Sequence, residues 1–457
     1  MNDNLYGYRY FGNSVKVSDN SWKSGLNGND LIFGTSGSGK TRGYVLPNIL
    51  RTQGSIITID AKNQLYNKTK ESLEARGYRV ELLDFENLSN STIGYNPLDF
   101  IGKDKIGRWS TEDIRKISHL LMSGIEDKDE PYWSVAAESM IETYITFVME
   151  AVSEHTKTID IAADVMNNLA GKNGVKAVRY IRDGVFKEDD PYYDRNFPES
   201  DKELRKYLVP AGRSAYPLGM HFYSNPGCRS GKLYMKNVEN MVEAEKTYGC
   251  IISFANMGFD AFTSPEIVSL NNASKRIDFR DIATHRMAVF VNVSDSDRSK
   301  DVLVSLFYNQ LFEQLLRFGR TCEDSRLPVP VRIIMDDFSS GTKIDHFDRI
   351  ISVIRSYDIS ASIILQSMTQ LYSMYGEASA KTIANNCDHI LYLGGQDMDT
   401  ISFIAEHADR TRQSVMGLPL DQAILITRGE SKARMIPNVF LDLADVADET
   451  AKDRQAV

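Results

Sequence analysis

The sequence contains little cysteine, and the cysteines are widely spaced. Its 457 residues include four, Cys228, Cys250, Cys322 and Cys387, and no two of them form a C-x-x-C pair. Structural zinc sites and disulfide frameworks use close, regular spacings, so this pattern is typical of a reduced cytosolic protein. The seven histidines are equally scattered. We therefore expect no structural zinc site and no metal cluster built from histidines.

The chain also lacks any apolar run near the ~20 residues that cross a bilayer. Its N-terminus, MNDNLYGYRYFGNSVKVSDN, is polar and aromatic and has no feature of a secretory signal. The net charge of -9 argues against non-specific coating of DNA, although a pore needs only its own lining to be positive. These absences exclude an exported or membrane-spanning chain and predict a cytoplasmic protein.

Short apolar segments alternate with helical patterns through much of the sequence. Because most of these segments are continuously apolar, they predict strands of a parallel sheet covered on both faces. The predicted strands are Asp30–Phe33, Ser55–Ile59, Arg79–Leu83, Met287–Val293, Val331–Met335, Ser360–Leu365, His389–Leu393 and Ala423–Thr427. A helix is predicted between two of them, over Asp301–Phe318. The fold class is therefore α/β with a mostly parallel sheet.

A mostly helical block interrupts this alternation. Ser110 to Asp113 has the form of a capping box with Asp in place of Glu, and Trp133–Val152 predicts a strong amphipathic helix. We therefore expect a nucleotide-binding domain in two parts around an all-α domain. The predicted boundaries are 1–103 for its first part, 104–265 for the all-α domain, 266–440 for its second part and 441–457 for a C-terminal tail.

A phosphate-binding motif follows the first predicted strand and precedes a helical pattern. It fits G-x-x-x-x-G-K-[ST] in full with Gly34, Thr35, Ser36, Gly37, Ser38, Gly39, Lys40 and Thr41. In such a loop the backbone amides cradle the phosphates, the lysine adds a positive charge and the threonine hydroxyl binds Mg²⁺. The motif therefore predicts that ATP and Mg²⁺ bind here. Pro47 lies inside the following helical pattern, where we expect it to kink the helix.

Two adjacent aspartates end the apolar segment VRIIM. A P-loop NTPase needs an apolar strand, expected beside the P-loop strand, that ends in an aspartate holding the Mg²⁺ shell. Asp336 fits that position, and Asp337 is placed to orient or deprotonate the attacking water. Gln366 follows the next predicted strand and is expected to face the same crevice. Arg355 ends a predicted helix, where it is either a surface charge or a residue that reaches a neighbouring subunit's nucleotide.

Taken in order, these motifs resemble the type IV coupling proteins, the TraG/TraD-like ATPases of conjugation and type IV secretion. The matching segments run from Gly34 to Ser414, and the most specific are SVIRSYDISASIILQSMTQLYSMYG and KTIANNCDHILYLGGQDMDT. The resemblance implies a RecA-like domain interrupted by an all-α domain, with ATP-dependent hexamer assembly around a channel. It also implies that Lys40, Thr41 and Asp336 bind the magnesium nucleotide, that Arg355 acts in trans and that Gln366 senses the γ-phosphate.

The implied partners are single-stranded DNA with its relaxase, or secreted proteins, together with components of the secretion channel. Two departures from the family bear on function. The family often has Glu where this chain has Asp337, whose shorter side chain predicts slow hydrolysis. The family also usually begins with transmembrane helices; their absence predicts either a cytosolic fragment or a protein recruited to the inner face of the membrane by a separate anchor.

Three functions remain open on these observations. The first is an ATP-hydrolysing coupling protein that recruits cargo and powers or licenses its transfer. The second is a nucleotide-gated docking receptor with little turnover. The third is a DNA-pumping ATPase of the segregation or packaging kind, which does not account for the inserted helical block.

Overall fold

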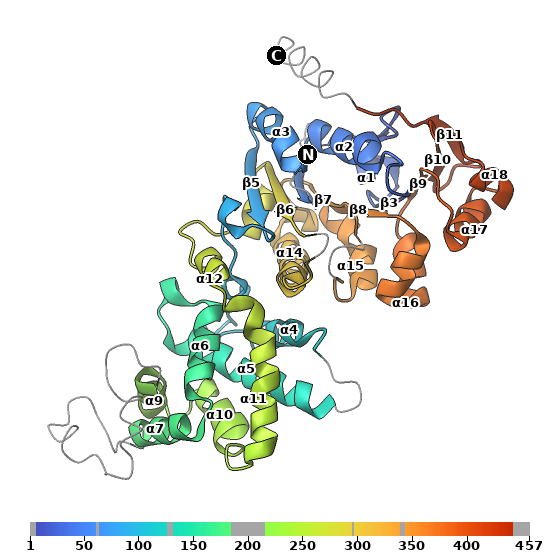
Figure 1. Cartoon of the computed structure of the whole chain (residues 1–457). Helices are drawn as coiled ribbons and strands as arrows, with labels where there is room; N and C mark the ends of the chain where they lie inside the picture. Colours follow the sequence, from blue (N-terminus) through green and yellow to red (C-terminus); the bar gives the residue numbers. More distant parts are fainter. Residues whose placement is uncertain are drawn as a thin grey trace. The chain divides into compact units, whose positions relative to one another are not determined.

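The computed structural model describes residues 6–60, 64–125, 131–183, 215–294, 297–338 and 343–441 (Figure 1). The chain forms two compact units. One comprises the residues up to Ile93 together with those from Ile277 onward, and the other is Gly94–Arg276. The sequence placed the edges of the helical block at 104 and 265, inside the edges of this second unit.

A nine-stranded sheet forms the centre of the first unit, in the order β11-β10-β9-β3-β8-β7-β4-β6-β5. The strands from β3 to β9 pair in parallel, and β10 and β11 are antiparallel at one edge. Their bounds are β3 Asp30–Phe33, β4 Ser55–Ile59, β5 Arg79–Asp84, β6 Met287–Asn292, β7 Val331–Met335, β8 Ile359–Leu365, β9 His389–Tyr392, β10 Gln422–Thr427 and β11 Arg434–Pro437. The mostly parallel α/β sheet expected from the sequence is confirmed.

Every strand predicted from a continuous apolar run is present, with bounds that differ by one residue at most. Three short strands were missed: β11 and the separate antiparallel pair β1 (Tyr8–Phe11) and β2 (Val15–Ser18). These segments mix charged and apolar residues in only four positions. Runs this short carry no clear period, and it is their tertiary neighbours that hold them extended.

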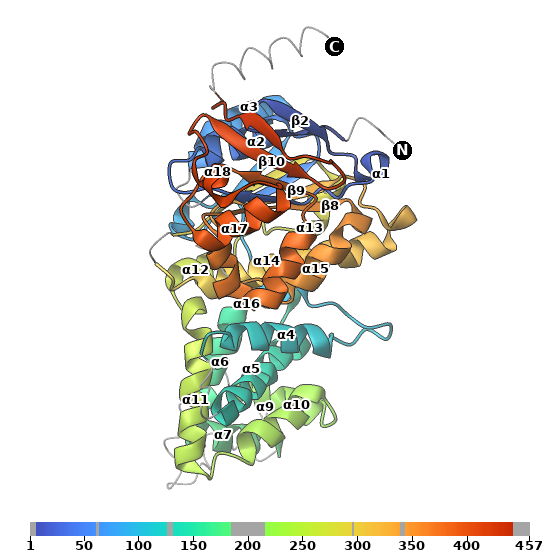
Figure 2. The ribbon, with the colours of Figure 1, turned by 90° about the vertical axis from the view of Figure 1, so that its right-hand side faces the viewer.

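Helices cover both faces of the sheet (Figures 1 and 2). Figures 1 and 2 place α2 (Leu46–Arg51) and α3 (Gln64–Ala75) on one face, and α14 (Asp301–Thr321), α15 (Phe347–Val353) and α16 (Met368–Asn385) on the other. The core under α2 and α3 joins residues of both helices to residues of the strands. Burial on both faces explains why the strands are continuously apolar. The remaining α-helices described in this unit are α1 Ser21–Ser24, α13 Phe279–Thr284, α17 Met398–His407 and α18 Arg412–Met416.

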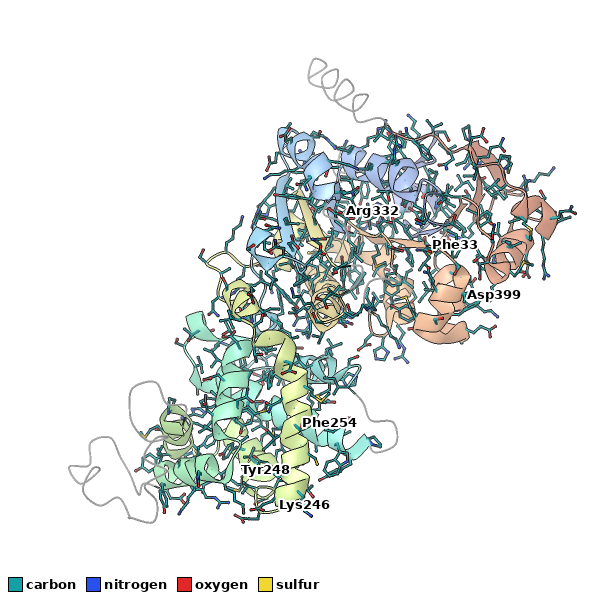
Figure 3. All side chains as sticks on the ribbon, viewed as in Figure 1. Phe33, Lys246, Tyr248, Phe254, Arg332 and Asp399 are labelled. Carbon is teal, nitrogen blue, oxygen red and sulfur yellow. The ribbon has the colours of Figure 1, made fainter. Side chains whose placement is uncertain are left out.

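The described residues of the second unit form helices joined by turns and loops, with no strand. Its α-helices are α4 Thr111–Met122, α5 Pro131–Ala151, α6 Ile159–Leu169, α7 Lys172–Arg182, α9 Ala215–Ser224, α10 Arg229–Tyr234, α11 Glu245–Phe259 and α12 Pro265–Asn271. The long helix α5 packs against α4, α6, α10 and α11. Figure 3 labels Lys246, Tyr248 and Phe254 along α11. In the part of the chain that the structure describes, no helix is both long enough and apolar enough to cross a membrane.

The capping box predicted at the start of α4 forms only in part. The Ser110 hydroxyl accepts a hydrogen bond from the Asp113 backbone amide at 3.2 Å, as expected. The Asp113 carboxylate does not return this bond to Ser110, because it accepts from the Gly102 amide at 2.9 Å. The Ser110 amide donates to the Gly102 carbonyl instead. Aspartate is one methylene shorter than the glutamate of a full capping box, so its carboxylate reaches a different donor.

Candidate nucleotide-binding site

The loop Gly34–Thr41 leaves the carboxyl end of β3 and is held from both sides. The Gly34 amide donates to the carbonyl of Leu365 at the end of β8, and the Thr35 amide donates to the Gly394 carbonyl after β9. Gly37 and Gly39 have φ of 79° and 91°, which residues with a side chain rarely adopt. The glycines of the motif therefore allow a backbone turn that other residues would strain.

A π-helical turn, Thr41–Val45, connects this loop to α2. The Leu46 amide, which ends the turn, donates to the Thr41 carbonyl five residues earlier. Pro47 then occupies the first turn of α2 and has no N–H to donate to the preceding turn, where the Arg42 carbonyl accepts a hydrogen bond from the Leu441 amide. The irregularity expected from Pro47 is thus a change of helix type that ends before the proline.

Lys40 lies folded over the loop. Its ammonium group donates to the carbonyl oxygens of Gly34 at 2.7 Å and of Thr35 at 3.1 Å. Burial lowers the pKa of Lys40, and the nearby carboxylates of Asp336 and Asp337 oppose this shift. The ammonium group therefore lies at the mouth of the loop, within the field of both aspartates.

The site brings together the threonine of the loop and the first aspartate after β7. The Thr41 hydroxyl donates to a carboxylate oxygen of Asp336 at 3.2 Å, across 295 positions of sequence. Burial raises the pKa of Asp336 to about 6, against the opposing effects of Lys40 and of the Thr41 hydrogen bond. A buried carboxylate with a raised pKa beside a hydroxyl is a donor set that suits a divalent cation, since Mg²⁺ prefers oxygen ligands.

The sequence predicted that the strand carrying Asp336 lies beside the P-loop strand, but the two strands are not neighbours. β8 lies between β3 and β7 and pairs in parallel with both. This prediction was wrong because sequence order does not determine strand order. Asp336 still reaches Thr41, because all three strands end at the same edge of the sheet and Thr41 lies at the end of the P-loop.

Asp337 adopts a strained backbone conformation. Its φ is 50°, in the left-handed region, and its amide donates to the carboxylate of Asp336 at 3.1 Å. Its Oδ1 atom is buried and has no hydrogen-bond partner among the described residues. Strained residues and unsatisfied buried oxygens are costly, and they occur most often at binding and catalytic sites.

The two remaining candidates lie at opposite edges of the sheet. Gln366 directly follows β8, next to Gly34, and its side chain is exposed. Arg355 precedes β8, so the seven residues of that strand separate it from the carboxyl edge, a distance of about 20 Å. Its guanidinium donates to the Ser21 carbonyl at 3.0 Å and lies over the Trp22 ring. The structure therefore brings Gln366 to the site and places Arg355 away from its own loop.

Sequence analysis missed a segment that packs on the loop, Asn438–Leu441. The Asn438 side-chain amide donates to the Ser38 carbonyl at 3.0 Å, and the Leu441 amide donates to the Arg42 carbonyl at 3.1 Å. The Phe440 ring lies so close to Gly39 that a Cβ there would overlap it, and the Arg42 guanidinium lies 5.1 Å from the ring centroid.

Leu441, assigned to the tail from the sequence, is buried; the rest of the predicted tail, 442–457, lies outside the described residues. No local motif marks Asn438–Leu441 as part of the site, because its partners lie about 400 residues earlier.

A family model matches most of the chain. The model described as "Type IV secretory system Conjugative DNA transfer" matches residues 8–417. This match covers the whole helical unit and most of the other unit.

Sequence and structure relatives agree with the family match. VirD4 of Agrobacterium fabrum (strain C58) is 21% identical over 409 residues, covering 88% of this chain and 51% of that protein. The coupling protein VirD4 of Bartonella henselae is 20% identical over 448 residues, covering 93% and 60%. The chain thus spans about half the length of the curated relatives it matches.

The plasmid coupling protein TrwB, solved in complex with ADP and Mg²⁺, matches with a TM-score of 0.59 at 13% identity, covering 91% of this chain and 86% of that one. Its complex with the ATP analogue ADPNP gives the same TM-score at 12% identity and the same coverage of both chains. At these identities the likeness concerns the fold, a RecA-like domain interrupted by an all-α domain. Because the family model covers most of the residues, the chain belongs to the conjugative DNA transfer family of type IV secretory systems, the type IV coupling proteins.

Proposed function

We propose that this chain is the ATP-hydrolysing core of a coupling protein that recruits cargo to a type IV secretion or conjugation channel and powers or licenses its transfer. One observation carries the proposal: Lys40 and Thr41 of the loop meet Asp336 at the carboxyl edge of the sheet, where Thr41 and Asp336 are 3.2 Å apart. Family membership supports the secretion context, and the TrwB complexes with ADP and ADPNP support a nucleotide as ligand.

In this proposal each residue of the site has one task. Lys40 exchanges its two carbonyl partners for phosphate oxygens, which are stronger acceptors for an ammonium group. Thr41 and Asp336 would supply oxygen ligands to Mg²⁺, which when bound would neutralise negative charge on the phosphates. Asp337 orients the attacking water, and Gln366, beside Gly34, senses whether the γ-phosphate is present.

The direct test is steady-state ATPase activity with and without single-stranded DNA. Lys40→Ala is expected to lower turnover at least ~100-fold, because charge developing on the phosphate loses its nearest cation. Lys68→Ala, which removes an exposed lysine of α3, is the matched control and should leave turnover unchanged. Robust hydrolysis by Lys40→Ala would reject the assignment of this site.

The position of Arg355 favours a ring-shaped homo-oligomer, which we propose to be a hexamer. A residue about 20 Å from its own loop cannot act there, so a catalytic role requires a neighbouring subunit. Arg355→Ala and Lys40→Ala are each expected to be inactive alone. In an equal mixture, about a quarter of the interfaces pair an intact loop with an intact arginine, so about a quarter of the activity should return.

An inactive mixture that still assembles would assign Arg355 to its own subunit, where it binds the carbonyl of Ser21. The assembly itself is checked by particle size with and without an ATP analogue and single-stranded DNA. Arg326→Ala is a suitable control, since Arg326 also lies on the Trp22 ring, 3.6 Å from its centroid, but belongs to a different loop.

A second function, a nucleotide-gated docking receptor with little turnover, is favoured by Asp337. Its short side chain and left-handed backbone limit how far its carboxylate reaches. Asp337→Glu restores the longer side chain and distinguishes the two functions. If wild-type turnover is measurable and rises or holds in this variant, the chain is a motor; negligible turnover in every condition favours the receptor. The family match favours both over a DNA-pumping ATPase of the segregation or packaging kind.

The cargo and the membrane attachment form the last part of the proposal. We propose that the helical unit receives single-stranded DNA with its relaxase, or secreted proteins, and that the chain works at the inner face of the membrane with channel components and a membrane-anchor partner. Membership of a DNA transfer family favours the nucleoprotein cargo. Cross-linking of the helical unit to relaxase or DNA in mating cells would test it, with the nucleotide-binding unit as the internal control.

A further inference from the structure

Three side chains of the helical unit that could bind a metal converge although they are far apart in sequence. Glu150 lies in the last turn of α5, His221 in α9 and Cys228 directly before α10. One ligand atom from each lies within 4.8 Å of those of the other two. The His221 Nε2 and a Glu150 oxygen are 3.5 Å apart. The sequence predicted no such cluster, because the spacing of these residues matches no metal motif.

These distances suit a single ion. Around a tetrahedral zinc ion with bonds of ~2.0–2.3 Å, neighbouring ligand atoms lie roughly 3.4–3.7 Å apart. The imidazole and the carboxylate already have this separation. The thiol needs to approach by about 1 Å at most, which a small side-chain rotation provides.

The surroundings orient each ligand. A Glu150 oxygen accepts hydrogen bonds from the Ser230 amide at 3.1 Å and from its hydroxyl at 2.5 Å. The Cys228 sulfur accepts from the Gly231 amide at 3.3 Å. The His221 ring packs edge-on against Phe147, and its Nε2 is buried without a hydrogen-bond partner of good geometry among the described residues. Such outer contacts hold metal ligands in place and tune their affinity.

The cluster also has an open side. Cys228 lines a hollow of about 480 Å³ together with Phe222, Gly231 and Lys232. Glu150 and His221 do not line the hollow, so a fourth ligand, water or a side chain of a bound partner, can approach from it on the side of Cys228. Three protein ligands with one open position are a common arrangement for bound zinc.

We propose that Glu150, His221 and Cys228 bind a Zn²⁺ ion that joins the end of α5 to the α9–α10 turn. The mixture of sulfur, nitrogen and oxygen ligands favours zinc over Mg²⁺ and Ca²⁺, which take oxygen ligands. The ion fixes two short helices, of which α9 otherwise packs mainly against α7 and α10 packs against α5. This site lies wholly within the helical unit and is independent of the nucleotide site and its proposed chemistry.

The test uses the full chain, stripped of metal by a chelator and dialysed, and titrated with Co²⁺ as a spectroscopic substitute for zinc. We expect a thiolate-to-cobalt charge-transfer band at one equivalent, which Zn²⁺ then abolishes. Cys228→Ser should lose the band, and His221→Ala or Glu150→Ala should weaken binding at least ~10-fold. Cys250→Ser, which removes an exposed cysteine of the same unit, is the matched control and should keep the band.

Two further measurements do not depend on the folding of a variant. Zn²⁺ alone, at 100-fold above its dissociation constant, should raise the melting temperature of the stripped wild-type chain by about 3 °C. It should also protect Cys228, but not Cys250, from alkylation by iodoacetamide, as read by peptide mass spectrometry. Absence of the cobalt band and of protection in the wild type would overturn the proposal and leave an imidazole–thiol–carboxylate hydrogen-bonded cluster. A band retained by Cys228→Ser would overturn it as well.

Discussion

The two ends of β3 both carry buried charges, but only one end has partners for all of them. At the amino end, Asp30 forms ion pairs with Arg9 and Arg332 and accepts a hydrogen bond from the Tyr44 hydroxyl at 2.5 Å. Burial raises the pKa of Asp30, and the two guanidinium groups oppose that shift. Figure 3 labels Arg332 and Phe33, the last residue of β3. Asp19 also pairs with both arginines, so each charged group at this end has an ionic partner, although Arg9 Nε and His389 Nε2 form no hydrogen bond among the described residues. We call this end closed with respect to charge.

The carboxyl end is open by comparison. Lys40 donates to backbone carbonyls of its own loop, Asp336 keeps a raised pKa, and Asp337 leaves one buried oxygen without a partner among the described residues. The two ends differ in whether their charged groups already have partners within the protein. A closed network contributes to stability and specificity, whereas an open one is complete only when a ligand supplies the missing charges.

The largest effect is expected at the open end. Asp336→Asn should lower ATP turnover at least ~100-fold, because the neutral amide is a poor Mg²⁺ ligand. The free energy of unfolding should stay unchanged or rise, since the variant removes a buried carboxylate whose pKa is raised to about 6. Turnover and denaturant unfolding, measured on the same preparation, separate the two effects. A large loss of stability would mean that this end is as closed as the other.

The opposite outcome is expected at the closed end. Asp30→Ala should lower the free energy of unfolding by about 3–5 kcal/mol, because it leaves two buried guanidinium groups short of a partner. Denaturant unfolding measures this loss. Glu377→Ala, which breaks an exposed ion pair with Lys381, should leave the unfolding midpoint unchanged. An equally small change for Asp30→Ala would show that Arg9 and Arg332 are satisfied by Asp19 alone.

The charged groups at the amino end of β3 should also make the free energy of unfolding depend on pH. Burial and the charges of Arg9 and Arg332 lower the pKa of His389 to about 2, far below the 6.5 of an unfolded chain. Between these values the unfolded state binds one more proton, so stability falls by about 1.4 kcal/mol per pH unit as the pH drops below 6.5.

This dependence is tested by denaturant unfolding between pH 5 and 6.5. Below about pH 6 the raised pKa of Asp336 acts in the opposite sense, as does the raised pKa of Asp30, so the contribution of His389 is measured as the difference in slope between wild type and a His389 variant. His389→Asn is expected to have a shallower slope in the test window than wild type. Identical slopes would mean that His389 is protonated in the folded protein.

A smaller effect is expected where Phe440 packs on the loop. Phe440→Ala should weaken nucleotide binding a few-fold, by about 1 kcal/mol, because Gly39 and Arg42 lose the ring that supports them. Titration with a fluorescent nucleotide measures this change. Val439→Ala is the matched control, because Val439 is similarly exposed and its contact with Gly12 runs through the backbone. Equal affinities for the two variants would show that the loop is rigid without this segment.

Much of this architecture could be predicted because its signals are local. Most parallel strands are continuous apolar runs, and the P-loop residues are adjacent in sequence, so backbone geometry and burial follow from neighbouring residues. The proposed roles of Lys40, Thr41, Asp336, Asp337, Arg355 and Gln366 remain predictions of the motifs. The structure adds where each lies, and it corrects the order of the strands by placing β8 between β3 and β7.

What the sequence by itself determined is the set of elements and the one motif whose chemistry is contained in eight consecutive residues. Tertiary structure alone decided that Phe440 packs on Gly39, that Arg355 lies away from its own loop, and that Glu150, His221 and Cys228 meet. The physical reason is the same in each case. These contacts join segments separated by tens to hundreds of residues, and the packing of strands and helices, which leaves no periodic pattern in the sequence, determines which distant segments become neighbours.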